Sequence, residues 1–263
     1  MAQDCWSRLR VSMYKRLVPV LLIEGERTVK TINFKDGRYL GSPLNIVRIF
    51  NAKEVDEIIV LDISATKKHR GPNFELIKAL ADECSIPCAY GGGIRTLEDA
   101  SKIFSFGYDK IVMQSSFFDN PEFISKVASL RGAQAVSLSL DVIRDQSGDF
   151  KLFNYINREI RDLDLITEVT TAINLGCGEI IVNSVDRDGC MNGLDIELVK
   201  YIKKFCKVPL TILGGLASFE DAKLAIEHGA DAVGGGSFFS YKSKTKGILI
   251  SYPKTPLTNA QLK

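Results

Sequence analysis

The hydrophobic positions of this chain fall into short apolar runs separated by amphipathic segments. Buried parallel strands read as near-continuous apolar runs, and by that rule we predict strands at Leu17–Ile23, Ile58–Ile63, Pro87–Tyr90, Lys110–Gln114, Ala135–Asp141, Glu179–Val185, Pro209–Leu213 and Ala230–Gly235. Helical periodicity occupies most of the intervals: Pro43–Ala52, Asn73–Glu83, Leu97–Phe106, Pro121–Leu130, Leu163–Leu175, Asp195–Phe205 and Phe219–His228. The alternation of strand and helix predicts an α/β protein with a closed parallel sheet.

The two ends of the chain depart from this alternation. Residues 1–12 carry no periodic pattern, and we predict a loose extension there, followed by a single domain over residues 13–263. After the last strand the chain offers no good helical segment, and Ile248–Tyr252 reads as extended. The final helix is therefore predicted to be missing or replaced.

The chain also nearly repeats itself at an offset of 122 residues, the distance from Glu57 to Glu179. Residues 57–63, Glu-Ile-Ile-Val-Leu-Asp-Ile, return at 179–185 as Glu-Ile-Ile-Val-Asn-Ser-Val. Each copy holds strand, helix, strand, helix and strand, a unit too long for a small solenoid repeat. Two such copies predict a (β/α)8 TIM barrel built from two similar half-barrels, with functional residues at the strand ends.

The composition narrows the class of protein. With 34 basic and 32 acidic residues the net charge is +2, and no basic stripe with interleaved aromatic residues indicates a nucleic-acid partner. Apolar runs such as Leu17–Ile23 fall far short of the roughly 20 residues of a membrane span, and residues 1–15 lack the apolar core of a signal peptide. Six cysteines without a CxxC pair favour reduced thiols in a cytoplasmic protein. Two histidines argue against a histidine-rich metal site, and no cofactor is indicated.

Glycine-rich segments follow equivalent strands in the two halves. Gly91-Gly92-Gly93 and Gly214-Gly215 allow backbone N–H groups to approach an anion, and each is followed one strand later by a hydroxyl, in Gln114-Ser115 and in Gly235-Gly236-Ser237. Two such loops, related by the internal repeat, would bind a substrate that carries a phosphate at each end. The alternative is that the glycines only turn the chain out of a strand.

Carboxylates at strand ends are the candidates for proton transfer. Asp141 ends the fifth strand, where a general acid or base would face the barrel mouth. The equivalent position in the first half is Leu22, so a catalytic pair across the barrel is broken. Asp62 and Asp188 lie at or just beyond other strand ends, although Asp188 could equally belong to a salt-bridged turn.

Charged residues also stand at the starts of strands, on the opposite face. Arg16 precedes the first strand, and Glu57, Lys110 and Glu179 begin the second, fourth and sixth. Because an unpartnered buried charge is costly, these four side chains must pair with one another. On this pattern alone they are a structural ring that seals the floor of the barrel.

From about Arg16 to Phe239 the chain resembles the cyclase subunit of imidazole glycerol phosphate synthase, the HisF family. The matching segments are Arg16, Val29-Lys30, Asn33-Phe34, Leu61-Asp62-Ile63, Gly91-Gly92-Gly93-Ile94, Ser184-Val185-Asp186-Arg187-Asp188-Gly189 and Gly214-Gly215. The resemblance implies that the barrel receives ammonia from a glutaminase (HisH-like) partner under its floor and delivers it to a phosphorylated small molecule at the top.

The resemblance also implies roles for individual residues. The four charged floor residues would form an ammonia gate, Asp109 beside Lys110 would face the glutaminase, and Asp141 would be the general base. Residues that match the family's phosphate and substrate contacts are Lys30, Asp62, Gly92, Gly93, Gln114, Ser115, Asp188, Gly189, Gly214, Gly215, Gly236 and Ser237. No metal is implied.

Departures from the family indicate one of its branches. Leu22 stands where the family has an essential aspartate, Gln114-Ser115 replaces an Asn-Thr phosphate contact, and Gly247–Pro253 replaces short C-terminal helices. The C-terminal segment, the Leu21-Leu22-Ile23 of the first strand, and Asn33-Phe34-Lys35 followed by Tyr39-Leu-Gly-Ser-Pro43 resemble the acetamidino modification paralogue (AglZ/WbuZ type) found with surface-sugar genes. That resemblance implies a glutaminase partner and an ATP-dependent sugar amidotransferase, which together convert an acetamido to an acetamidino group in lipopolysaccharide or flagellar sugar biosynthesis.

Three interpretations stay open. In the first, the chain is an ammonia-channelling subunit of such an amidotransferase complex, without the cyclase (lyase) activity of the family. In the second, it is an authentic cyclase of histidine biosynthesis, in which Glu24, two residues beyond Leu22 on the same side of the strand, replaces the missing acid. In the third, it is a non-catalytic scaffold for the glutaminase.

Overall fold

The computed structural model of the chain describes residues 15–242, 247–253 and 257. The predicted extension over residues 1–12 therefore lies outside the described residues. Within the described ranges, every helix falls short of the length and apolarity that crossing a membrane requires.

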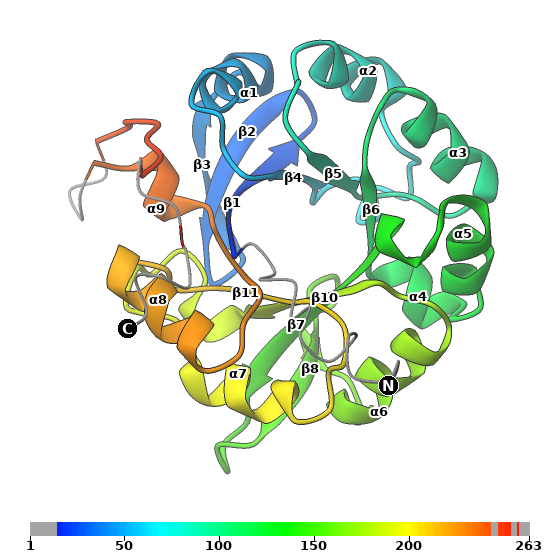
Figure 1. Cartoon of the computed structure of the whole chain (residues 1–263), viewed down its shortest axis with the longest axis vertical. Helices are drawn as coiled ribbons and strands as arrows, with labels where there is room; N and C mark the ends of the chain where they lie inside the picture. The colour runs from blue at the N-terminus through cyan, green and yellow to red at the C-terminus, as the bar shows by residue number, and fades with distance from the viewer. Residues whose placement is uncertain (1–14, 243–246, 254–256, 258–263) are drawn as a thin grey trace, which may run out of the picture.

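Parallel strands close into a barrel at the centre of the molecule (Figure 1). Each pairs with the next along the chain, β12 pairs with β1, and β7 pairs with β10, so the ring has no open edge. The barrel strands are β1 (Arg16–Glu24), β4 (Ile58–Asp62), β5 (Cys88–Gly91), β6 (Lys110–Met113), β7 (Val136–Arg144), β10 (Glu179–Ser184), β11 (Leu210–Leu213) and β12 (Ala232–Gly235). The predicted (β/α)8 barrel is confirmed.

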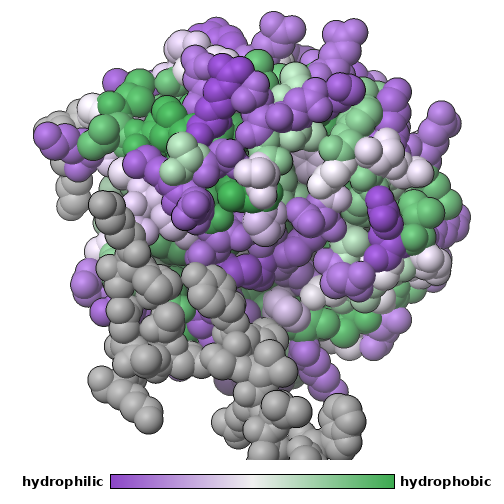
Figure 2. All heavy atoms as spheres, turned by 45° about the horizontal axis from the view of Figure 1, so that its top comes forward, coloured by the Kyte–Doolittle hydropathy of each residue, from purple (hydrophilic) through white to green (hydrophobic). Residues whose placement is uncertain are grey.

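Helices surround the barrel (Figure 1) and bury their apolar faces on its outer side. They are α1 (Pro43–Ala52), α2 (Phe74–Asp82), α3 (Leu97–Ser105), α4 (Ser115–Asp119), α5 (Phe123–Arg131), α6 (Leu165–Asn174), α7 (Ile196–Lys203), α8 (Phe219–Glu227) and α9 (Ser237–Ser240). The internal repeat extends to the helix starts, since Thr96 and Ser218 both form capping boxes, with Asp99 and Asp221. The outward faces are largely hydrophilic on the side seen in Figure 2.

Two hairpins that the sequence analysis did not predict follow the first strand of each half. One consists of β2 (Arg27–Ile32) and β3 (Lys35–Gly41), and the other of β8 (Phe150–Asn154) and β9 (Glu159–Ile160). They meet over the barrel, where the Phe34 and Phe153 ring centroids are 6.3 Å apart and Arg158 Nη1 donates to the Phe34 carbonyl over 3.1 Å. The hairpins therefore bring two halves of the chain together above one end of the strands.

In the described part of the chain's end, the four-residue helix α9 and an extended segment occupy the place of the last helix, as the sequence predicted. Ile248 forms an antiparallel bridge with Tyr241. Tyr252 stacks on Phe239 with centroids 5.7 Å apart, and its hydroxyl donates to the Leu17 carbonyl and accepts from the Asp56 N–H. The segment thus closes the outer layer between α9 and the start of β1.

The barrel interior is layered because alternate residues of each strand face the axis. Charged residues occupy the floor, and polar residues gather at the mouth, where the strands end. An apolar layer separates them, formed by Val18, Val20, Ile59, Ala89, Val112, Ile181, Leu213 and Ala232.

We predict that Tyr252 contributes to stability through both its ring and its hydroxyl. Tyr252→Phe removes the hydroxyl that bonds Leu17 and Asp56, and should lower the free energy of unfolding by about 1–2 kcal/mol. Tyr252→Ala should cost about 3 kcal/mol or more, because the stacked ring is also lost. Urea unfolding measures both, and Tyr39→Phe, at a tyrosine that is 48% exposed, is the control with little expected change. Equal stability of the Tyr252 variants and the wild type would contradict the packing role of the segment.

Candidate functional site

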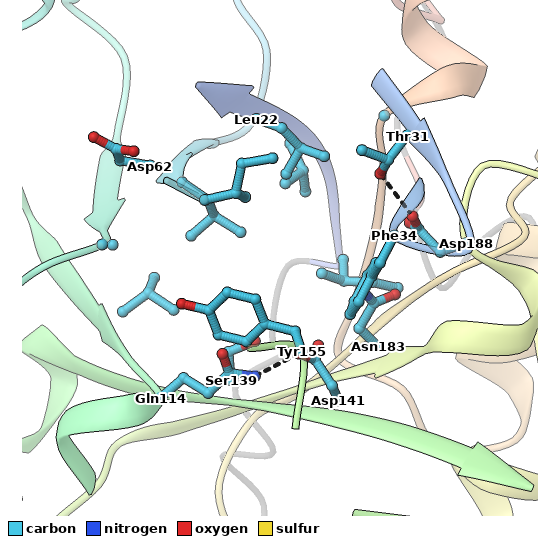
Figure 3. Close-up of a pocket in the computed structure, with 18 of the residues that line it drawn as sticks. Leu22, Thr31, Phe34, Asp62, Gln114, Ser139, Asp141, Tyr155, Asn183 and Asp188 are labelled. Carbon is cyan, nitrogen blue, oxygen red and sulfur yellow. Dashed lines mark hydrogen bonds between the residues drawn. The ribbon is translucent and has the colours of Figure 1, made fainter. Parts of the chain in front are cut away.

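A cavity opens at the mouth of the barrel, where the strands end (Figure 3). The sequence analysis marked a set of residues for catalysis or substrate binding, and the structure places each of them on its wall: Leu22, Lys30, Asp62, Gly92, Gly93, Gln114, Ser115, Asp141, Asp188, Gly189, Gly214, Gly215, Gly236 and Ser237. The residues are thus brought together from both halves of the chain, while what they bind stays a prediction.

Asp141 ends the inward-facing row of β7 and is buried. Gln114 Nε2 donates to its Oδ2 over 2.6 Å (Figure 3). Burial raises the pKa of Asp141 to about 7, and the charge of Asp188 adds to this rise, while the Gln114 and Asn183 amides oppose it. A carboxyl group with a pKa close to neutral can accept or donate a proton at physiological pH.

Lys30 and Asp188 form a second polar group at the mouth. Burial lowers the pKa of Lys30 to about 8, opposed by the charge of Asp188, and Lys30 Nζ donates to the Val20 carbonyl over 2.5 Å. Burial likewise raises the pKa of Asp188 to about 6, although Lys30 and the Thr31 hydroxyl, which donates over 3.2 Å, oppose the rise. Lys30 is presented by β2, so this pair depends on the first hairpin.

The carboxylate of Asp62 binds residues of the loop that follows it. Its Oδ1 accepts hydrogen bonds from the Ser64 N–H, the Ser64 hydroxyl and the Ala65 N–H, and its Oδ2 pairs with Arg70 Nη2 at 2.7 Å. These contacts order the loop after β4. The geometry therefore gives Asp62 a structural task at the cavity wall.

Leu22 pairs in register with Leu61 of β4 and presents an aliphatic side chain to the cavity. Among the described residues of the cavity wall, the carboxylates are Asp62, Asp141 and Asp188. Glu24, the candidate replacement for the missing acid, is exposed and is not part of this wall.

Close packing requires glycine at equivalent positions of the two halves. Gly92 and Gly214 have φ angles of +118° and +93°, and a Cβ at either would collide with the carbonyl of the neighbouring strand's end, Asp62 or Ser184. Their role in turning the chain is therefore real. The same loops line the cavity beside Ser115 and Ser237, the first residues of α4 and α9, where N–H groups lack intrahelical partners.

The four charged residues at the floor pair in an alternating ring. Arg16 contacts Glu57 and lies 2.7 Å from Glu179, while Lys110 Nζ lies 2.8 Å from Glu57 and 2.7 Å from Glu179. Both glutamates are buried. Because two cations face two anions, the ring neutralises itself.

Glu179 has additional partners in this ring. The Thr211 hydroxyl donates to it over 2.6 Å and the Ser137 hydroxyl over 3.2 Å. Burial alone would raise the pKa of Glu179, but Lys110 and Arg16 outweigh burial and hold the pKa at about 2. The carboxylate therefore stays charged at any physiological pH.

Asp109 lies at the edge of the floor and is exposed. Its Oδ2 accepts the Cys88 N–H over 2.9 Å, and at the repeat-related position Asp231 accepts the Leu210 N–H over 3.1 Å. The repetition shows that each aspartate fixes the start of a neighbouring strand. The exposure of Asp109 leaves it accessible to a partner as well.

Some residues of the cavity wall were missed by the sequence analysis. Phe34 and Tyr155 come from the two hairpins, which were not predicted. Asn183 could have been found by counting alternate residues of its strand from Glu179, since positions 179, 181 and 183 face the same way. The described residues contain no group of three or more histidine, cysteine, aspartate or glutamate side chains arranged to bind a metal ion.

We predict a pH-dependent stability that originates at Asp141. Its folded-state pKa of about 7 lies above the unfolded value of about 3.9, so between these pH values the folded protein holds a proton that the unfolded chain has lost. Its contribution to stability therefore falls as pH rises through this range. Asp141→Asn should gain stability relative to the wild type by on the order of 1 kcal/mol per pH unit from about pH 4 to pH 7.

Urea unfolding at pH 5 and pH 8 measures this difference. Asp119→Asn, at an exposed position, is the matched control. A stability difference between Asp141→Asn and wild type that is the same at both pH values would contradict the prediction.

Comparison with known proteins identifies the family. The family model described as histidine biosynthesis protein matches residues 16–246. The chain is 47% identical to a Leptospira borgpetersenii protein named "Putative imidazole glycerol phosphate synthase subunit HisF", over 90% of this chain and 94% of the relative. It is 40% identical to the hisF3 protein of the same description from Vibrio vulnificus, over 90% and 92%, and 33% identical to imidazole glycerol phosphate synthase subunit HisF of Streptomyces coelicolor, over 86% and 90%. The chain therefore belongs to the histidine biosynthesis protein family, as a HisF-like member.

Proposed function

We propose that this chain accepts ammonia from a glutaminase subunit at the floor of its barrel and supports the amidination of a surface-polysaccharide or flagellar sugar, from acetamido to acetamidino. The glutaminase and an ATP-dependent sugar amidotransferase are the partners that the resemblance implies. The support comes from the interior of the barrel.

One observation carries the proposal: a row of polar residues connects the charged floor to the mouth. Ser137, Ser139 and Asp141 stand at alternate positions of β7 and so face the same way, toward the axis. Ser137 donates to Glu179 of the floor ring, and Asp141 lies on the cavity wall. The other side chains of the middle layer are apolar. A small polar molecule such as ammonia would find successive hydrogen-bond partners along this row.

An acceptor without a partner lies at the upper end of the row. Asn183 Oδ1 is buried and has no hydrogen-bond partner among the described residues. A buried acceptor in this state is stabilised by a donor that enters the site. The N–H groups of ammonia are such donors, and Asn183 stands opposite Asp141 in the β7–β10 register.

The residues at the mouth suit the acceptance of a proton by one group, Asp141, better than closure of an imidazole ring. The resemblance implies that the family's cyclase chemistry uses a pair of acids, and Leu22 occupies the position of one of them here. Glu24 is exposed and away from the cavity wall, which weighs against the authentic-cyclase interpretation. Asp141 alone, with a pKa of about 7, suits the removal of a proton from an attacking ammonia nitrogen.

We predict that Lys110→Ala disturbs ammonia transfer. Lys110 bridges both glutamates, so its loss opens one side of the ring and leaves two carboxylates sharing Arg16. In the reconstituted complex, the variant should release more ammonia to solvent per glutamine hydrolysed, or should change glutaminase coupling. Lys126→Ala, at an exposed lysine of α5, is the control.

Because Lys110→Ala leaves buried charge unpaired, we expect stability to fall by about 3–5 kcal/mol, and Lys110→Met, which keeps the apolar stem, is measured beside it. Unfolding and ammonia release are recorded for both variants. Normal ammonia transfer in both, accompanied only by lower stability, would show that the ring is structural and would favour the scaffold interpretation.

We also predict that the purified chain does not close the imidazole ring when supplied with the bis-phosphorylated histidine intermediate and ammonium. A positioned proton-transfer group contributes about 10²–10⁴-fold, and Leu22 removes one of two. Leu22→Asp should raise any residual turnover, while Glu24→Gln should leave it unchanged. Turnover of the wild type on the order of 1–10 per second would contradict the prediction, as would growth of a histidine auxotroph complemented by this chain.

A further inference from the structure

The loops at the barrel mouth carry very different charges in the two halves. The loop after β4 reads Thr66-Lys67-Lys68-His69-Arg70, whereas the repeat-related residues 188–192 read Asp-Gly-Cys-Met-Asn. Arg95, after the glycines that follow β5, corresponds to Ala217. The half-barrels share their glycines but not these cations: the loop of the second half has Arg187 instead, which corresponds to Ala65 and donates to the Gly193 carbonyl over 3.0 Å. The repeated part of the fold therefore does not require a cation at the positions of Lys67 and Arg95.

Two of these cations line the cavity, Lys67 and Arg95. Neither side chain forms an ion pair within the part of the chain that the structure describes. Arg70, in contrast, is neutralised by Asp62 at 2.7 Å. The cavity therefore presents two positive charges on the side of β4 and β5, while Asp141 and Asp188 stand on the side of the second half.

The two cation-bearing loops are fixed against one another. Asp62 accepts the N–H groups of Ser64 and Ala65, and Asp99 accepts the Arg95 N–H over 3.1 Å. Gly93, at φ +75°, lets the loops touch, since a Cβ there would come within 3.0 Å of the Arg70 carbonyl. The backbone positions of Lys67 and Arg95 are thus determined by the packing of the loops.

An aromatic ring faces the same place from across the mouth. Lys67 Nζ lies 5.4 Å from the centroid of Tyr155, in the turn between β8 and β9. The hairpin is tied to the first one by Arg158, which donates to the Phe34 carbonyl. Figure 3 shows the Tyr155 ring extending over the cavity.

We propose that Lys67, Arg95 and Tyr155 form a subsite for the diphosphate and base of a nucleoside diphosphate, the carrier group of the sugar to be modified. The assignment of the nucleotide as a sugar carrier rests on the proposed function. Binding of a nucleoside diphosphate at these three residues does not. Arg95 lies two residues beyond Gly93, and both line the cavity together with Gly92, Ser115 and Lys67. A diphosphate held at this wall would use both cations and the N–H groups of the glycine loop.

The aromatic ring determines the rest of the ligand. Any of the planar nucleic-acid bases can stack on an aromatic side chain. Guanidinium and ammonium groups bind phosphate oxygens through charge-assisted hydrogen bonds. With the diphosphate held by the first half, the attached sugar would extend across the cavity toward Asp141. This arrangement places the group to be modified at the upper end of the Ser137–Ser139–Asp141 row.

Isothermal titration of the full-length chain with UDP, UMP and inorganic pyrophosphate tests the proposal. UDP should bind more tightly than either UMP or pyrophosphate. Lys67→Ala and Arg95→Ala should each weaken UDP binding about ten- to a hundredfold, because each removes a charged partner of phosphate. Lys68→Ala, the adjacent exposed lysine outside the cavity wall, should leave UDP binding unchanged.

Tyr155 separates the nucleotide from other sources of diphosphate. Tyr155→Ala should weaken UDP binding about fivefold or more while leaving pyrophosphate binding unchanged, and Tyr155→Phe should restore the affinity for UDP. Thermal unfolding checks that each variant is folded. Failure of UDP to bind, equal binding of UDP and pyrophosphate, or an equal effect of Lys67→Ala and Lys68→Ala would overturn the proposal.

The test is independent of ammonia transfer. UDP binding is measured on the chain alone, and ammonia transfer is measured on the wild-type complex with the glutaminase in the absence of UDP. Wild-type protein that binds UDP and transfers ammonia supports both proposals, whereas wild-type protein that transfers ammonia without binding UDP refutes the subsite alone. Wild-type protein that binds UDP and transfers no ammonia refutes the proposed function and leaves the subsite standing.

Discussion

The alternation of side chains along a closed ring of parallel strands limits what the interior of this protein can hold. The inward residues of the strands form successive layers, so a charged layer, an apolar layer and a polar layer can follow one another over a few residues. The charged layer is possible only because Arg16, Lys110 and the two glutamates pair completely. The apolar layer keeps the floor and the mouth apart, and β7 interrupts it with Ser139. The separation of the floor from the mouth depends on that order of layers.

The internal repeat separates structural demands from functional ones. Features present in both halves, such as the capping boxes at Thr96 and Ser218 and the left-handed glycines at 92 and 214, are explained by packing that both halves need. Features present in one half require another reason. Asp141 corresponds to Leu22, and Lys67 and Arg95 correspond to Gly189 and Ala217.

The sequence predicted the barrel well because its strands are buried on both sides and therefore read as continuous apolar runs. It also placed the inward residues of the floor, since Glu57, Lys110 and Glu179 precede those runs directly. The two hairpins were missed because their burial comes from contacts between distant segments, such as Phe34 with Phe153, which no local period records. For the same reason Tyr155 could not be assigned to the cavity. Asp62 lies on the cavity wall as expected, yet its carboxylate is engaged by Ser64, Ala65 and Arg70, and only coordinates reveal such occupancy.

The two glutamates of the floor are not equivalent, and this has a mechanical consequence. Within the described residues, Glu179 is held by Arg16, Lys110, Ser137 and Thr211, whereas Glu57 is held by Arg16 and Lys110 alone. Detaching Glu57 breaks half as many contacts as detaching Glu179. The ring is therefore held more strongly at Glu179 than at Glu57. The side of the ring next to β4 is the easier one to displace.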